Sequence, residues 1–179
     1  MRAKTYRVAL GGILTALAVC VMFLGSVIPF ATYISPALAS LAVLYFAVEY
    51  HTGAALLIYA AISALALLIA PDKEQALLFA CFLGWYPAAK FPIERKLKAV
   101  PAMVFKLVLC NASLFALYYV ITRVLVIAAV RDEFAEFTTA IVIALAVLGN
   151  LTFIIFDKAL TRLSMLWLAK WRPRLSGEK

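Results

Sequence analysis

The ionisable and amide side chains inside long apolar stretches are the residues of this 179-residue chain that could do chemistry. Arg123 lies eight residues before Arg131, which places it about 12 Å along a helix from the nearest loop. A charge inside a bilayer is costly and is commonly functional, so Arg123 is a candidate for binding an anionic group or for an internal ion pair. The alternative is that its long side chain reaches the outer headgroups.

Three further polar residues are candidate ligand contacts. Asn150 is expected near the middle of the last apolar stretch, where a hydrogen bond to another helix is the competing interpretation. Tyr33 and Lys73 follow or precede apolar stretches on the same predicted side as Arg123. We therefore expect a substrate pocket near the outer surface, in which the cations favour an anionic ligand. Its predicted substrate-binding residues are Arg123, Lys73, Tyr33 and Asn150.

Catalytic motifs are missing from the sequence. It contains no His-Glu-x-x-His, no Gly-x-Ser-x-Gly and no glycine loop that could hold a phosphate. The single histidine, His51, follows Glu49 at a predicted inner loop, where a solvated pair is the ordinary interpretation. We expect a protein that is not an enzyme, that binds no metal or cofactor, and that does not bind nucleic acid.

Composition indicates that the protein is embedded in a membrane. Hydrophobic residues make up 66% of the chain and charged residues 15%, and the mean hydropathy is +1.02, far from the composition of a soluble domain. Six helices of about 20 residues would occupy most of the chain. We predict an all-α fold, a single membrane domain over residues 1–179. The predicted spans are 8–28, 36–49, 53–70, 73–86, 101–130 and 137–168, with an amphipathic interfacial segment over 90–98.

Local signals set several of these boundaries. Ser35 before Pro36 is typical of a helix start, with the serine as N-cap. Asp72 followed by Gln75 resembles a capping box, and Pro87 is expected to end the helix that begins there. The spans 36–49 and 73–86 are short, and short helices often border a cavity in transporters. Reduced tilt or a thinner bilayer would explain them equally well.

The basic residues predict the orientation. If both termini are inside the cell, 14 Lys and Arg residues lie on the inner side and 3 on the outer side. This asymmetry is what the positive-inside rule requires for an N-in, C-in protein.

The first predicted helix has a row of small residues. Ala9, Gly12, Ala16 and Cys20 recur at intervals of three and four, a spacing that lets another helix approach closely. Residues 60 and 64, both alanine, form a similar row on the third helix. We expect one of the two rows to face inward.

This layout resembles the substrate-binding S components of energy-coupling factor (ECF) transporters. The similarity lies in the basic N-terminus, a first helix reading Arg7-Val-Ala-Leu-Gly-Gly-Ile-Leu-Thr-Ala-Leu-Ala18, and six N-in helices in about 180 residues. That family has an Ala-x-x-x-Ala motif on the first helix, which docks onto a transmembrane coupling subunit. The matching positions here are Gly12 and Ala16, with Ala9 alongside, so glycine replaces the first alanine.

The resemblance implies uptake of a vitamin or similar micronutrient across the prokaryotic inner membrane. The chain would bind the small molecule near the outer face, and its partners would be a coupling subunit and two ATPase subunits. Two other classes stay open at this point. One is a six-helix scaffold of cell-envelope or sporulation machinery without a small-molecule substrate, and the other is a lipid-modifying enzyme, which the missing catalytic motifs disfavour.

Overall fold

A computed structural model describes residues 2–28, 31–120 and 138–171. These residues are helical and form no strand, which confirms the predicted all-α class. The chain divides into two compact units, Met1–Ala102 and Met103–Lys179. The arrangement of both units as one membrane domain stays a prediction.

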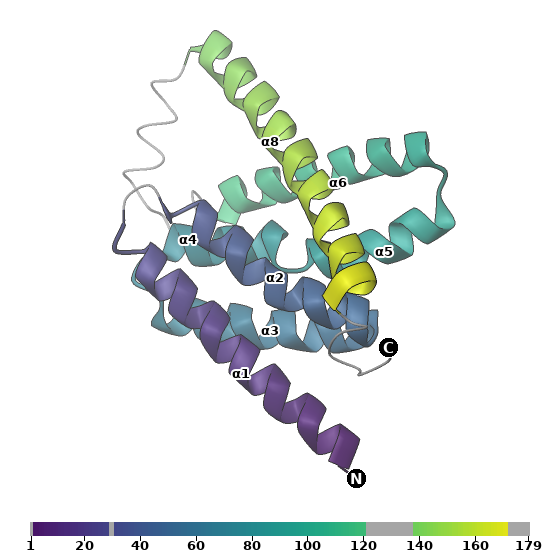
Figure 1. Cartoon of the computed structure of the whole chain (residues 1–179). Helices are drawn as coiled ribbons and strands as arrows, with labels where there is room; N and C mark the ends of the chain where they lie inside the picture. The colour runs from purple at the N-terminus through teal and green to yellow at the C-terminus, as the bar shows by residue number, and fades with distance from the viewer. Residues whose placement is uncertain (1, 29–30, 121–137, 172–179) are drawn as a thin grey trace. The chain divides into compact units, whose positions relative to one another are not determined.

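The first unit is built on three helices that pack against one another, α1 (Arg2–Gly25), α2 (Ile34–Glu49) and α3 (Thr52–Ile69) (Figure 1). Met22, Phe46 and Ile62, one from each helix, are fully or almost fully buried in their shared core. Alanines fill much of the remaining core, and their small side chains allow close helix packing. The buried alanines of this core are Ala18, Ala39, Ala54, Ala55, Ala66, Ala70, Ala76 and Ala88.

The predicted helix 73–86 is interrupted. It consists of α4 (Lys73–Leu78) and a π-helical turn over Phe79–Leu83, after which α5 (Tyr86–Lys96) begins. The expectation that Pro87 ends a helix is wrong, because Pro87 lies in the first turn of α5, where its missing N–H has no helical partner to lose.

Side chains satisfy the backbone around this π-helical turn. The Tyr59 hydroxyl donates to the Ala80 carbonyl at 2.7 Å, and the Trp85 indole N–H donates to the Cys81 carbonyl at 2.7 Å. Such bonds matter because an irregular turn leaves carbonyls without their usual partners, which is costly away from water.

The predicted amphipathic segment 90–98 lies mostly within α5. It is helical through Lys96 and belongs to an apolar stretch, Lys73–Lys96, that is long enough to cross a membrane. Lys90 has no exposed surface and pairs with Glu94 at 2.7 Å, so this lysine is not on a solvated face. Placement of the segment in the headgroup layer stays a prediction.

Side chains cap the starts of α3 and α4, but not the start of α2. The Asp72 carboxylate accepts from the N–H groups of Glu74 and Gln75, which confirms the predicted cap of α4. The ring of His51 caps α3 by accepting from the Ala54 N–H. Ser35 is not the predicted cap, because α2 begins one residue earlier and Ser35 donates back to the Ala31 carbonyl within its first turn.

The second unit contains most of α6 (Ala99–Tyr119) and all of α8 (Thr139–Leu166), which continues as a π-helical turn over Trp167–Trp171. The predicted spans 101–130 and 137–168 agree with these helices where they can be compared, but residues 121–137 lie outside the described part of the chain.

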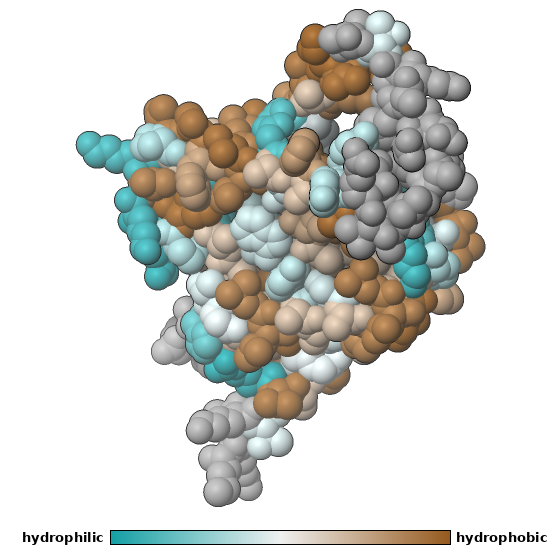
Figure 2. All heavy atoms as spheres, turned by 180° about the vertical axis from the view of Figure 1, so that it is seen from behind, coloured by the Kyte–Doolittle hydropathy of each residue, from teal (hydrophilic) through white to brown (hydrophobic). Residues whose placement is uncertain are grey.

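Among the described residues, five helical stretches are long and apolar enough to cross a membrane, and α2, with 16 residues, is a shorter apolar helix. Hydrophobic side chains cover much of the visible surface, and polar ones gather in small patches (Figure 2). A surface of this kind suits lipid better than water, which supports a multi-pass membrane protein. The six-span count and the N-in, C-in orientation stay predictions.

Gly25 provides a test of the packing at the end of α1. A side chain there would collide with Ser35 and Gln75, whereas a side chain at Gly12 would meet nothing within 4 Å. Gly25→Ala should therefore lower the free energy of unfolding by about 1–3 kcal/mol, the usual cost of overpacking. Gly12→Ala, the matched control, should leave it unchanged or slightly raised. Thermal unfolding in detergent measures both, and equal stability of the two variants would contradict the packing.

Candidate functional site

A groove is hollowed into the first unit between α1 and α3. It encloses about 680 Å³, which is within the range of about 300–1,000 Å³ for small-molecule sites. Arg7 lies at one end of its α1 wall, and Phe46 of α2 also contributes. The predicted docking residues Gly12 and Ala16 both line it. The other lining residues are Val8, Gly11, Thr15, Ala54, Leu57, Ile58, Ala61 and Leu65.

The row of small residues on α1 faces away from the core of the unit. Its four members are exposed, whereas Gly11, Thr15 and Ala18 on the neighbouring face of α1 are buried. The exposed members are Ala9, Gly12, Ala16 and Cys20. Ala60 and Ala64 on α3 are exposed as well. The expectation that one of the two rows faces inward is therefore wrong.

Arg7, near the start of α1, contacts two residues that directly precede α3, Tyr50 and His51. The Arg7 guanidinium lies 5.1 Å from the centre of the Tyr50 ring and, through Nη2, 3.1 Å from Nε2 of His51. The two helices therefore run in the same direction from a shared basic end. His51 is a helix cap and an arginine neighbour, and the interpretation as a simple solvated pair with Glu49 missed both contacts.

A polar cluster joins the C-terminal end of α1 to the first turns of α2 and α4. The buried Gln75 side chain accepts from the Ser26 hydroxyl at 2.8 Å and donates to the Ser35 hydroxyl. Nearby, the Tyr33 hydroxyl, in a residue that is 64% exposed, donates to Glu74 at 3.5 Å. Sequence reasoning placed Ser35 at this end but assigned Gln75 to a helix cap, because nothing in its spacing distinguishes a cap from a buried bridge.

Two of the predicted ligand contacts are engaged within the protein. The Lys73 ammonium donates to the carbonyls of Leu67 and Ala70 at 2.9 and 3.0 Å, so it closes the end of α3. The Asn150 side chain of α8 exchanges two hydrogen bonds with Asn111 of α6, at 2.9 and 3.2 Å. The helix-to-helix hydrogen bond that competed with a ligand role for Asn150 is confirmed.

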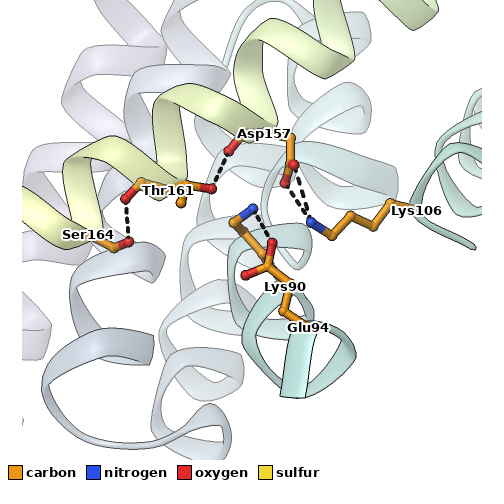
Figure 3. A network of polar contacts seen from close by, with 6 residues as sticks. All are labelled: Lys90, Glu94, Lys106, Asp157, Thr161 and Ser164. Carbon is orange, nitrogen blue, oxygen red and sulfur yellow. Dashed lines mark hydrogen bonds and ion pairs between the residues drawn. The ribbon is translucent and has the colours of Figure 1, made fainter. Parts of the chain in front are cut away.

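A buried ion pair also joins α6 and α8. The Lys106 ammonium contacts both carboxylate oxygens of Asp157 at 3.2 Å, and the two residues are only 3% and 7% exposed (Figure 3). The Asp157 backbone carbonyl also accepts from the Thr161 hydroxyl. The sequence alone favours an interfacial position for Asp157 beside Lys158. The signal that could have found this pair is a lysine and an aspartate at similar predicted depth on two different helices.

The pocket predicted for the four substrate-binding residues stays a prediction, because these residues belong to different units or lie outside the described part of the chain. Tyr33 and Lys73 belong to the first unit and are absent from the lining of its groove. Asn150 belongs to the second unit, where it borders a shallow hollow of about 440 Å³ lined by α8 alone. Arg123 lies outside the described residues.

Within residues 2–28, 31–120 and 138–171, no group of three or more metal-binding side chains occurs. Comparisons with protein-family models, with curated proteins and with solved structures found no match. Function must therefore be argued from the residues themselves.

The pair of Lys106 and Asp157 provides a test of the second unit. Asp157→Leu leaves a buried ammonium without its counter-ion and should cost about 3–5 kcal/mol, and Lys106→Met should cost a similar amount. The double variant removes both charges and should recover most of the lost stability. Thermal unfolding in detergent measures all three. A double variant whose loss equals the sum of the single losses would show that the charges do not depend on each other.

Proposed function

We propose that this chain is the substrate-binding membrane subunit of an ATP-driven micronutrient uptake transporter, an S component of the ECF class in a prokaryotic inner membrane. The observation that carries the proposal is the exposed row of small residues on α1. This row contains Gly12 and Ala16, the positions that match the docking motif of that family. Partner subunits would supply the ATP hydrolysis for which this sequence has no motif.

The row of small residues leaves the surface of α1 open to close approach by another helix. A side chain added at Gly12 would meet no atom within 4 Å, so the backbone of another helix could approach this position closely. Association between membrane helices depends on such close packing, because lipid already surrounds apolar side chains. Since the core of the first unit uses the neighbouring face of α1, through Gly11, Thr15 and Ala18, a partner could dock on the exposed row without entering that core.

The ligand side of the proposal centres on Arg123, with Tyr33 at the same predicted outer face. Lys73 and Asn150 would contact a ligand only if they gave up hydrogen bonds that they make within the protein. An arginine in a low-dielectric setting binds a carboxylate or phosphate strongly. This reasoning favours a micronutrient with an anionic group.

Docking can be tested by filling the row. Gly12→Leu combined with Ala16→Leu should abolish copurification with the coupling subunit, because two added side chains keep the helices apart. Ala60→Leu combined with Ala64→Leu, a pair of insertions at exposed alanines of α3 with the same spacing, is the matched control and should leave copurification unchanged. Unchanged recovery of the coupling subunit by the double variant would overturn the docking assignment.

Ligand binding can be tested on protein purified from its own host in mild detergent after growth with a vitamin mixture. Native mass spectrometry should show a bound small molecule, and Arg123→Leu should lower its occupancy about tenfold or more through loss of a charge-assisted hydrogen bond. Arg95→Leu, which removes an exposed arginine of α5, is the control. A wild-type protein without any bound molecule or transporter subunit would favour the scaffold alternative instead.

A further inference from the structure

We propose that the groove between α1 and α3 binds one acyl chain of an anionic phospholipid, with the lipid phosphate held at its basic end by Arg7 and His51. This inference goes beyond transport, since a lipid site needs neither a partner nor a substrate. Gly12 and Ala16 line the groove, so a coupling subunit that docks at these residues would displace the lipid. It rests on the length of the groove, on the chemistry of its basic end and on its lining.

The groove has the length of one bilayer leaflet. Its α1 wall runs from Arg7 to Ala16, which is about 14 Å at about 1.5 Å per residue. Its α3 wall runs from Ala54 to Leu65, which is about 17 Å. The hydrocarbon core of a bilayer is about 30 Å thick, so the groove covers about half of it. One acyl chain of a lipid in that leaflet fits within this depth.

The basic end of the groove presents donors that call for an anionic acceptor. His51 uses Nδ1 to accept from the Ala54 N–H at 3.1 Å as the cap of α3. A neutral imidazole that accepts at Nδ1 carries its proton on Nε2. Nη2 of Arg7 is also a donor and lies 3.1 Å from that Nε2. Two nitrogens that can donate therefore lie next to each other at this end of the groove, and a phosphate oxygen placed beside both would accept from them.

The lining suits a flexible chain. Arg7 and Thr15 are its polar members, and Thr15 is buried on the side of the helix core. Gly12 lines the groove and leaves open space in it, because no atom lies within 4 Å of the place that a side chain would occupy there. The Arg7 guanidinium is held over the Tyr50 ring, so its position at the end of the groove does not depend on a long unsupported side chain.

The test is a titration of the delipidated full-length protein in detergent with phosphatidylglycerol or phosphatidylcholine of identical acyl chains, followed by native mass spectrometry. We expect phosphatidylglycerol to bind about fivefold more tightly, the contribution of one basic side chain to anionic lipid binding. Arg7→Gln should remove this preference. It should weaken phosphatidylcholine binding less, because the choline cation already offsets the charge of that lipid's phosphate. Gly12→Leu fills the groove and should weaken binding of both lipids at least about tenfold, because it displaces several methylenes.

Two controls separate the site from general effects. Arg95→Gln removes an exposed arginine outside the groove, and Ala60→Leu adds the same bulk at an exposed alanine that does not line it. Both should bind like the wild type. Retained preference in Arg7→Gln would overturn the headgroup assignment, and wild-type binding by Gly12→Leu would overturn the acyl-chain assignment. A dimer that forms in place of the lipid complex would instead assign the groove to a second copy. No partner subunit is present, so failure here leaves the transport proposal untouched.

Discussion

The requirement that polar groups find partners within the protein governs this structure. Apolar surroundings offer no water to a lysine, an asparagine or an irregular carbonyl, so each must be satisfied by another residue. Asn111 and Asn150 bond each other and also their own helices at 2.8 Å, to the carbonyls of Leu107 and Ala146. Lys106 and Asp157 neutralise each other. The π-helical turn is possible because Tyr59 and Trp85 reach its carbonyls.

Sequence reasoning predicted the helical fold well because apolar length and proline positions are local signals. It placed most helix ends within a few residues and identified Asp72 as a cap. It failed where the outcome depends on contacts between distant residues. Pro87 could end one helix or begin another, and Gln75 could cap α4 or bridge Ser26 and Ser35. Neither choice can be made from spacing alone.

The candidate sites show the same division between local and distant signals. The small-residue row on α1 could be recognised directly from its spacing, but the face on which it lies could not, and only the packing shows it to be exposed. Polar residues were recognised as important without their partners being identifiable. Lys73 became the closing residue of α3, and Asn150 became half of an amide pair. A polar residue in an apolar helix thus signals an interaction without saying whether its partner is protein or ligand.

The two polar contacts of α6 and α8 have a consequence for biosynthesis. They pair Lys106 with Asp157 and Asn111 with Asn150, which fixes the two helices as an antiparallel hairpin in one register. A slip by one turn, about 5.4 Å, would break both contacts together. Each charge is also costly to insert into apolar surroundings alone, and the cost rises toward the centre of a bilayer. Pairing with α8 therefore lowers the free-energy cost of inserting α6. The two helices favour entry into the bilayer together, because Lys106 and Asp157 are then neutral as a pair.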